Sequence, residues 1–535
     1  MFTLISVTEY VVIALGAALL FGLCVFNALG ALQQSGYAAK RYAHWLGRKG
    51  NMTRSRFTLL AFLIALSMLV LGIAFSFAGK WAGYVPLVSI PLFVSLYCVA
   101  ERRALKVPLR GTARAKRVYA LNLLVLAVLA FALIVGANAL AYFTEVTLIS
   151  HLRYLPLALL SLLQPWLLVV ANALEKPFSS ARNKKYLKKA ARILHEAKCV
   201  KIAVTGSFAK TGVKSYLAQI LSARYKVIAT PESFNTPLGI ARSVEKGLDC
   251  DFFIAEMGAR HAGDVAELCE LVQPDHCILT GICPQHLETF GSEEAIVAAK
   301  SEIFAGTKAG GFAVYGDIGT EKAVPYIKNL VKVPVGEHGE CGALDVKCTA
   351  KGTSFKLALG IRQVECSCKL LGAHSAYNVA LAAAMAYKLG MSAEEIAQAV
   401  SRLECVPHRL QPILSGGVTV LDDAYNANIR GAAEAVSVLR LFEGRKIVVT
   451  PGIVELGVLE EKENFAFGEK LTGLDLVLLV GDTLVGAVKN GYLKAGGDAE
   501  KLSVVPTLED AKKKLSSYLQ AGDTVLFLND LPDVY

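Results

Sequence analysis

The sequence of 535 residues predicts an α-helical transmembrane region followed by two α/β domains. Three observations predict this fold class: long apolar runs confined to the first third of the chain, short β-branched runs that alternate with helical patterns from residue 200 onward, and an uneven distribution of charge. Residues 1–199 contain 23 Lys and Arg against 5 Glu and no Asp, whereas residues 200–535 contain 33 basic and 40 acidic residues. The chain therefore consists of two unlike parts, and we expect a membrane-anchored protein rather than a purely soluble one.

Five apolar runs without any charged residue account for the first part. A helix of about 20 residues is long enough to cross a hydrocarbon core of about 30 Å. We therefore expect residues 1–175 to form a membrane domain with five transmembrane helices. The expected spans are 10–32, 57–78, 81–100, 118–142 and 154–174.

The basic residues between these runs predict their orientation. They concentrate between the first and second runs, between the third and fourth, and after the fifth. Because Lys and Arg are enriched in cytoplasmic loops, five crossings place the N-terminus outside and everything after residue 175 in the cytoplasm. We expect a multi-pass protein of the cytoplasmic membrane with membrane lipids as partners. We expect no nucleic-acid partner, because the basic excess coincides with apolar runs.

The second part alternates short β-branched runs with helical patterns, which is typical of parallel α/β sheets. An antiparallel pattern at 344–370 interrupts this alternation and predicts a hairpin insertion. Pro407 and Pro412 flank a short polar segment, after which the alternation begins again, so we expect a domain boundary there. The expected organisation is a basic amphipathic linker helix at 176–199, a central domain at 200–404 and a C-terminal domain at 405–535.

A candidate phosphate-binding loop follows the first strand of the central domain and leads into a helix. In such loops, backbone N–H groups at a helix N-terminus bind phosphate, a lysine reaches the terminal phosphates and a hydroxyl binds Mg²⁺. Ala209 stands where a standard loop has the glycine before the lysine, and Ala203 stands where it has its first glycine. From these residues alone, nucleotide binding and an ordinary strand-to-helix turn both remain open. The loop consists of Thr205, Gly206, Ser207, Phe208, Ala209, Lys210 and Thr211.

Eight short motifs, in order along the chain, resemble those of a known family. They are Ala203–Ser207 with Lys210–Thr211, Glu256–Ala259, His286–Glu288 with Phe290–Ser292, Ala299–Phe304, His374 with Asn378–Ala380, Val406–Leu410, Asp422–Asn428 and Val454–Gly457. Together they resemble the Mur ligases, the ATP-dependent amide ligases of bacterial peptidoglycan synthesis. The Asp422–Asn428 run is most similar to the branch that adds D-alanyl-D-alanine. The resemblance covers residues 200–535 and implies a P-loop-type central ATPase domain followed by a smaller, Rossmann-like C-terminal domain.

The resemblance implies an ATP- and Mg²⁺-dependent acid–amino acid ligase of cell-wall biogenesis. Transfer of the γ-phosphoryl group to a peptide carboxylate gives an acyl phosphate, which an amine then attacks. The implied partners are a cell-wall peptide precursor and an amino acid or a dipeptide such as D-alanyl-D-alanine. Two alternatives remain: a membrane-associated ligase that makes a poly-amino acid, and a membrane scaffold that binds nucleotide without catalysis.

The resemblance also implies roles for individual residues of the nucleotide and metal sites. Lys210 would neutralise the β- and γ-phosphates, and Thr211 would bind Mg²⁺. Glu256 and His286 would be further metal ligands; Glu256 ends an apolar strand, where parallel sheets usually place their chemistry. Lys300 matches a lysine that the family carbamylates, which would turn it into an anionic metal ligand.

Residues near and after the domain boundary complete the implied site. Asn378 would lie on the adenine side, Arg409 would meet the γ-phosphate and Asp423 would meet the ribose. The catalytic set is Lys210, Glu256, His286, Lys300 and Arg409. The expected substrate contacts are Asn235, Thr236, Asn426 and Asn428.

One departure from the family concerns the acceptor. Mur ligases carry an N-terminal domain that holds the UDP of the precursor, and the segment between the last apolar run and the phosphate loop is too short for a domain. We therefore expect the membrane part to hold the acceptor, and a lipid-linked peptide and a UDP-linked peptide both remain open.

Overall fold

The computed structural model describes residues 4–22, 25–47, 109–144, 155–285, 287–425, 428–454, 456–481 and 483–528. The chain forms two compact units. One comprises Met1–Asn183 with Leu531–Tyr535, and the other comprises Lys184–Asp530.

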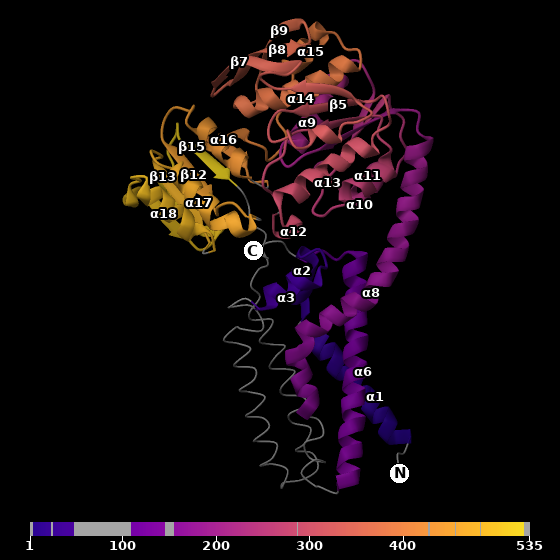
Figure 1. Cartoon of the computed structure of the whole chain (residues 1–535). Helices are drawn as coiled ribbons and strands as arrows, with labels where there is room; N and C mark the ends of the chain where they lie inside the picture. The colour runs from indigo at the N-terminus through magenta and orange to yellow at the C-terminus, as the bar shows by residue number, and fades with distance from the viewer. Residues whose placement is uncertain are drawn as a thin grey trace. The chain divides into compact units, whose positions relative to one another are not determined.

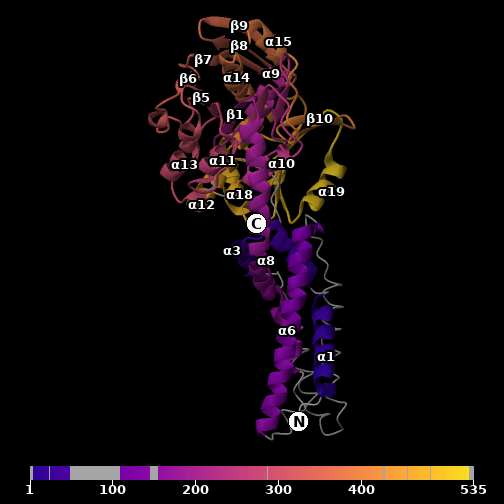
Figure 2. The ribbon, with the colours of Figure 1, turned by 90° about the vertical axis from the view of Figure 1, so that its right-hand side faces the viewer.

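The described part of the first unit is helical. Apolar side chains of α1, α6 and α8 pack together, with Tyr10 and Ala14 against Leu126, Ala130 and Leu160. Figure 2 shows α1 running beside α6. The helices are α1 (Leu4–Gly22), α2 (Phe26–Gln34), α3 (Ala39–Gly47), α6 (Ala113–Thr144) and α8 (Leu155–Glu196).

A buried ion-pair cluster joins α6 to α8 within this unit. The side chain of Glu175 is fully buried, and its two oxygens lie 3.1 Å from Arg114 Nε and 2.6 Å from Arg117 Nη2. Arg114 also stacks on the ring of Tyr37, with its guanidinium carbon 4.0 Å from the ring centre. A buried carboxylate without such partners would strongly destabilise the fold, so this cluster fixes the pairing of the two helices.

The expected multi-pass membrane protein with an external N-terminus is wrong. In the part of the chain that the structure describes, one helix, Ala113–Leu140, is long and apolar enough to cross a membrane, and Tyr10–Leu19 is a shorter apolar helix. The run at 10–32 is split between α1 and α2. The runs at 57–78 and 81–100 lie outside the described residues.

This error has a physical reason, because apolar length alone does not separate a membrane span from a helix that packs against its neighbours. The expected fifth span and the expected linker helix also form one continuous helix, α8, so no break separates them at residue 175. The membrane-lipid partners inferred from the apolar runs lose their basis with this correction.

The central part of the second unit is a nine-stranded sheet in the order β2-β3-β1-β4-β5-β6-β7-β8-β9. Pairing is parallel from β2 to β7 and antiparallel from β7 to β9, which corresponds to the hairpin expected at 344–370. The strands are β1 (Val200–Thr205), β2 (Val227–Ala229), β3 (Phe252–Glu256), β4 (His276–Leu279), β5 (Phe312–Gly316), β6 (Val331–Val335), β7 (Cys341–Thr349), β8 (Gly352–Leu359) and β9 (Arg362–Cys368).

Helices cover both faces of this sheet (Figure 1). Alternate residues of β1 serve the two cores: Ile202 and Val204 pack with α9 and α14, whereas Ala203 packs with α11 and α13 on the other face. This alternation is what a strand buried on both faces requires. The helices are α9 (Lys210–Leu221), α10 (Pro237–Ser243), α11 (Asp264–Val272), α12 (Leu287–Phe290), α13 (Glu293–Gly306), α14 (Ala373–Lys388) and α15 (Ala393–Val400).

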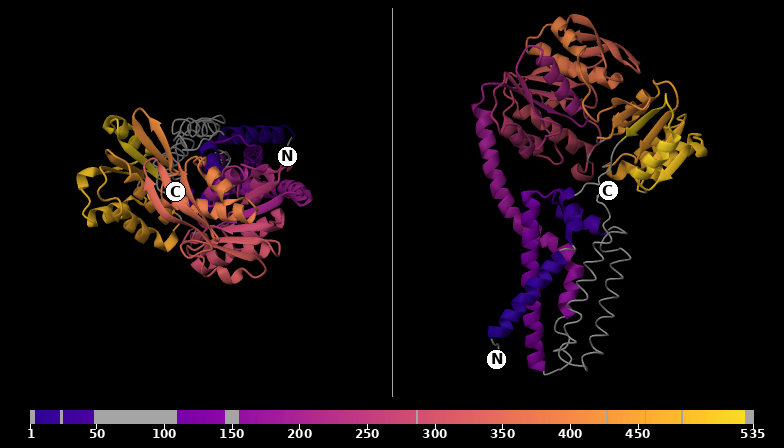
Figure 3. Two further views of the ribbon diagram at one scale, coloured as in Figure 1. Left: turned by 90° about the horizontal axis from the view of Figure 1, so that it is seen from above. Right: turned by 180° about the vertical axis from the view of Figure 1, so that it is seen from behind.

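The C-terminal part of this unit is a second, six-stranded sheet in the order β10-β11-β15-β12-β13-β14. Its strands pair in parallel except for the hairpin of β10 and β11. Figure 3 shows this sheet, in orange and yellow, with its own helices beside it. The prediction of two α/β domains with mainly parallel sheets is thus confirmed. The elements are β10 (Gln411–Ser415), β11 (Val418–Asp423), α16 (Ile429–Leu439), β12 (Lys446–Thr450), α17 (Glu460–Glu469), β13 (Leu476–Val480), α18 (Val485–Lys494), β14 (Leu502–Val505), α19 (Leu508–Tyr518) and β15 (Thr524–Leu528).

Candidate functional site

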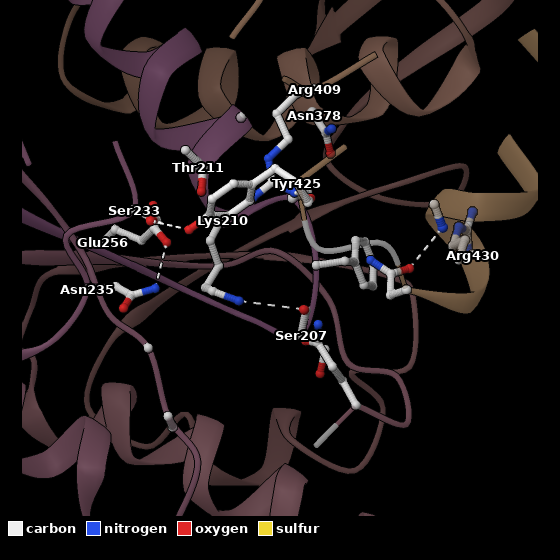
Figure 4. Close-up of a pocket in the computed structure, with 18 of the residues that line it drawn as sticks. Ser207, Lys210, Thr211, Ser233, Asn235, Glu256, Asn378, Arg409, Tyr425 and Arg430 are labelled. Atoms are coloured by element: carbon white, nitrogen blue, oxygen red, sulfur yellow. Dashed lines mark hydrogen bonds between the residues drawn. The ribbon is translucent and has the colours of Figure 1, made fainter. Parts of the chain in front are cut away.

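A cavity of about 620 Å³ lies where the central and C-terminal parts of the second unit meet. The carboxyl ends of β1 and β3, the first turn of α9 and the segment after β11 all contribute to its wall. Carboxyl ends of parallel strands are where α/β sheets bind ligands. Figure 4 shows Glu256, Asn235 and Ser233 on one side of Lys210 and Arg430 on the other.

The loop between β1 and α9 contains two residues with unusual backbone conformations. Gly206 has φ +147°, and a Cβ atom at this position would lie 2.0 Å from Thr280 Oγ1, so only glycine fits. Ala209, at the N-cap of α9, has φ 59° in the left-handed region. A non-glycine residue is strained in this conformation. The alanine that replaces the usual glycine of the loop is therefore an unfavourable residue at this position.

Lys210, the first residue of α9, folds back over this loop. Its Nζ donates to the carbonyl of Gly206 at 2.7 Å. Burial lowers the pKa of this amine, the nearby Glu256 opposes that shift and the nearby Arg409 adds to it. Lys210 is therefore held beside the loop. An anionic ligand bound there would raise the pKa of the amine and favour its charged form.

Glu256 ends β3 with only 1% of its surface exposed. Asn235 Nδ2 donates to its Oε1 at 3.0 Å. Lys214 Nζ donates to its Oε2 at 3.2 Å, forming a buried ion pair. The carboxylate is therefore held by groups from two different elements of the central domain.

Lys300 lies on α13 and is 3% exposed. Its pKa lies well below the ordinary value, first because of burial and then because of the positive charge of Lys210. A lowered pKa leaves more of the neutral amine, the form that reacts with CO₂ to give a carbamate.

The C-terminal domain contributes a second set of polar groups. Arg409 Nη1 donates to the carbonyl of Tyr425 at 2.8 Å, and its guanidinium lies 4.5 Å from the centre of that ring. The hydroxyl of Tyr425 hydrogen-bonds to that of Ser233 in the central domain. Burial raises the pKa of Asp423, which accepts from the backbone N–H of Leu410 at 3.1 Å. The two domains therefore share one hydrogen-bonded site.

Most of the residues expected from the sequence line this cavity, and a few do not. Thr205 is buried and donates to the carbonyl of Met257, and Gly206 and Lys300 also lie behind the lining. His286 and Asn426 lie outside the described residues. The expected residues that line the cavity are the loop 207–211 together with Asn235, Thr236, Glu256, Asn378, Arg409, Asp423 and Asn428.

The donor set suits Mg²⁺ and a polyphosphate better than a metal bound by protein alone. Thr211 and Glu256 offer oxygen ligands, and Lys210 and Arg409 offer positive charge. The described residues contain no group of three or more His, Cys, Asp or Glu that could hold a metal ion. Mg²⁺ commonly uses one or two protein oxygens together with substrate phosphates and water, so these residues fit Mg²⁺ bound with a nucleotide.

Asn378 lies beside the start of α9. A Cβ atom on Gly212 would lie 3.8 Å from Asn378 Nδ2. Asn428 instead caps α16, where its side chain accepts from the backbone N–H of Gly431 at 2.8 Å. This N-cap occupies the side-chain oxygen of Asn428, a residue that we expected to contact substrate.

Sequence reasoning missed several residues of the site. Lys214 lies four residues after Lys210 in a helix, so helical periodicity could have placed both on one face. Tyr425 lies inside a recognised motif but received no role, and Ser233 gave no signal because its partner is distant in the sequence. Arg430, whose guanidinium lies 6.0 Å from the centre of the Phe208 ring, also lines the cavity.

Two family descriptions match the second unit. The Mur ligase middle domain matches residues 204–386, and the Mur ligase, glutamate ligase domain matches residues 408–529. Both matches begin after residue 203, so they add nothing in favour of the membrane region expected before it.

Curated relatives support the same assignment. The chain is 31% identical over 295 residues to the UDP-N-acetylmuramoyl-tripeptide--D-alanyl-D-alanine ligase of Escherichia coli (strain K12), which covers 52% of this chain and 64% of that protein. It is 31% identical over 354 residues to the protein of the same name from Mycobacterium tuberculosis (strain ATCC 25618 / H37Rv), covering 61% of this chain and 69% of that relative. The chain thus spans less than two thirds of the length of the first relative.

Two solved structures are similar in fold and in sequence. MurF from Acinetobacter baumannii matches with a TM-score of 0.60 and 26% identity, covering 66% of this chain and 78% of that one. The MurF ligase from Thermotoga maritima in complex with ADP matches with a TM-score of 0.59 and 25% identity, covering 66% of this chain and 81% of that one.

Proposed function

We propose, from the premise that the chain belongs to the Mur ligase family, that it is an ATP- and Mg²⁺-dependent ligase that joins an amine to a cell-wall peptide carboxylate. The observation that carries the proposal is the cavity in which Lys210, Thr211 and Glu256 of the central domain meet Arg409 and Asp423 of the C-terminal domain. The incoming amine is that of D-alanyl-D-alanine, the dipeptide named in the relatives' activity.

The chemistry needs charge neutralisation and alignment more than covalent help from the protein. MgATP supplies the phosphoryl group that activates the carboxylate. The Lys210 ammonium and the Arg409 guanidinium approach the transferred group from two domains and offset its negative charge. Thr211 and Glu256 would hold Mg²⁺, and Lys300 would join them as a carbamate. His286, outside the described residues, completes this proposed ligand set.

The remaining site residues position the reactants. Asn378 faces the adenine side and Asp423 the ribose, while the loop 206–211 wraps the phosphates with its backbone N–H groups. We assign Asn235, Thr236 and Asn428, which line the cavity, to the peptide and the amine, and Asn426, outside the described residues, is assigned with them. Because these residues come from both domains, closure of one domain onto the other excludes water from the acyl phosphate.

The domain limits that we infer for this enzyme are 200–404 for the central ATP-binding domain and 405–535 for the C-terminal domain. The segment of α8 that precedes them is basic and packs Ala190 and Leu194 against the central sheet. We propose that this segment supports the central domain.

The proposal also concerns the carrier to which the acceptor peptide is attached. The relatives are named for a UDP-linked tripeptide, which is therefore the first acceptor that we propose, and a lipid-linked peptide is the second. A poly-amino-acid ligase and a non-catalytic scaffold are less favoured, because the relatives named above join D-alanyl-D-alanine.

The test is product formation by the purified full-length protein. The protein is given ATP, Mg²⁺ and either UDP-linked or lipid-linked tripeptide, together with D-alanyl-D-alanine or single amino acids, and products are identified by mass spectrometry. We expect one new amide bond and one phosphate per turnover, with activity at least 100-fold lower in Lys210→Ala. Phosphate release that does not depend on the amine would overturn the proposal, and so would wild-type rates in Lys210→Ala.

A further inference from the structure

Lys214 is a buried lysine of the cavity region to which the proposed chemistry gives no role. Only 3% of its surface is exposed. Its Nζ donates to Glu256 Oε2 at 3.2 Å and also to the backbone carbonyl of Glu232. A buried ammonium is costly unless it is paired, so these two acceptors are what allow a lysine at this position.

The partner of Lys214 is the same carboxylate that the proposed function assigns to Mg²⁺. Both oxygens of Glu256 already have a donor, because Asn235 Nδ2 holds Oε1 at 3.0 Å. The carboxylate is therefore clamped on both sides before any metal binds. A carboxylate oxygen has more than one lone pair, so each oxygen can still accept a cation beside its present donor.

The position of Lys214 on α9 determines which element the Glu256 carboxylate is tied to. Thr211 and Lys214 are three residues apart in one helix, so they lie on the same face. Lys214 thereby ties the end of β3 to the helix that carries the other proposed metal ligand.

We propose that Lys214 is a positioning residue that fixes the Glu256 carboxylate beside Thr211 so that Mg²⁺ meets a prearranged pair of oxygen ligands. The inference rests on the proposed function, because it takes these two residues as Mg²⁺ ligands. Lys214 acts on Mg²⁺ in two opposing ways: its charge repels the cation, and its hydrogen bond orders the ligand. The ordering effect outweighs the repulsion. Ordering a glutamate side chain costs conformational entropy, and because Lys214 orders Glu256 on folding, Mg²⁺ binding does not carry that cost.

The test compares the affinity for ADP with and without Mg²⁺, measured on the full-length protein by titration calorimetry. The ratio of the dissociation constant in EDTA to that in Mg²⁺ reports how well the metal is held, independently of turnover. We expect Lys214→Met to lower this ratio at least fivefold and Lys214→Arg to keep it within twofold of the wild type. If Lys214→Met does not fold, Lys214→Gln replaces it: the shorter, uncharged side chain also removes the ion pair with Glu256, and we expect the same fall in the ratio.

The matched control is Lys201, another buried lysine of the same domain. It is 4% exposed and donates to the carbonyl of Leu194 at 3.0 Å, outside the cavity lining. Lys201→Met should change the melting temperature without changing the ratio. This separates loss of a buried lysine as such from loss of the contact with Glu256.

The possible outcomes distinguish this inference from the proposed function. If Mg²⁺ does not change ADP affinity in the wild type, the proposed function fails. If the wild type shows the effect and Lys214→Met and Lys214→Gln retain it or bind Mg²⁺ more tightly, Lys214 does not position the ligand. In a Glu256→Gln background, Lys214→Met should lower the ratio no further, and a further fall would show that Lys214 does not act through Glu256.

Discussion

At the scale of single residues, the site depends on a few positions where backbone and burial leave little choice. Gly206 has no room for a side chain, Ala209 adopts a left-handed conformation, and desolvation lowers the pKa values of the Lys210 and Lys300 amines. Each of these features links a residue type to the chemistry that we propose.

Ala209→Gly should stabilise the protein slightly. The left-handed φ of 59° strains alanine, and glycine removes that strain while adding freedom to the unfolded chain. We expect a net gain of about 0.5–1 kcal/mol. Urea unfolding measures it, with Ala218→Gly in the middle of α9 as the control that should destabilise. A loss of stability in Ala209→Gly would mean that the loop is not strained there.

Lys300→Met should lower ligase activity by about 100-fold or more, because the proposed anionic ligand disappears. Burial lowers the pKa of Lys300, so near neutral pH more of it is the free amine that reacts with CO₂ than for an ordinary lysine. Wild-type activity should therefore fall in CO₂-depleted buffer and return when bicarbonate is added. Activity that is indifferent to bicarbonate would contradict carbamylation at this position.

Where a motif is local, sequence reasoning at this scale named residues that the fold brings to the cavity region. The loop 205–211, Glu256 and Arg409 each lie in short segments whose residue types suggest their chemistry. It missed Lys214 and Ser233, because their partners Glu256 and Tyr425 are distant in the sequence and only the folded chain brings them together.

At the scale of elements, hydrophobic periodicity predicted the strands and helices of the second unit well. The alternation of Ile202, Ala203 and Val204 between two cores follows directly from the geometry of a strand. The same kind of reasoning failed for the first unit, because an apolar run of about 20 residues fits either a membrane span or a helix packed against others. In α1, Tyr10 and Ala14 pack on α6, so part of this apolar run serves the packing of one helix on another.

An ion pair joins two parallel strands of the C-terminal sheet at their amino ends. Arg445, just before β12, donates to both carboxylate oxygens of Asp523, just before β15, at 2.9 and 2.7 Å. Asp523 is 4% exposed, and its hydrogen bond with Arg445 lowers its pKa below the ordinary value of 3.8.

Asp523→Asn should lower the melting temperature by several degrees at neutral pH. A carboxyl whose pKa is lowered on folding stabilises the protein above its unfolded pKa and loses that contribution as the pH falls through the folded value. The difference between the wild type and Asp523→Asn should thus be constant from pH 8 to pH 5 and shrink below about pH 3.8. Asp249→Asn, which breaks an exposed pair with Lys226, is the control and should have no measurable effect. A difference that grows on acidification would contradict the assignment.

At the scale of the second unit, the site exists only where its two domains meet. Central-domain residues provide the phosphate loop and the carboxylate, and the C-terminal domain brings Arg409 and Tyr425. The hydroxyl contact between Ser233 and Tyr425 joins them without any charge.

Tyr425→Phe should raise KM for ATP several-fold while changing kcat less, because it weakens the contact that holds the domains together and leaves the charged groups in place. Steady-state kinetics at saturating amine and peptide measure the two constants. Tyr387→Phe, on the opposite end of α14 from the cavity, is a control expected to leave both unchanged. A fall in kcat alone would mean that Tyr425 acts in the chemical step instead.

The most direct test of the central claim follows the oxygen of the peptide carboxylate. If that carboxylate attacks the γ-phosphorus of ATP and the amine then displaces phosphate from the acyl carbon, one carboxylate oxygen leaves with the phosphate. A peptide labelled with ¹⁸O in the reacting carboxylate should therefore yield inorganic phosphate that carries one ¹⁸O atom, detected by mass spectrometry, together with the new amide. Amide formation with unlabelled phosphate would contradict the account.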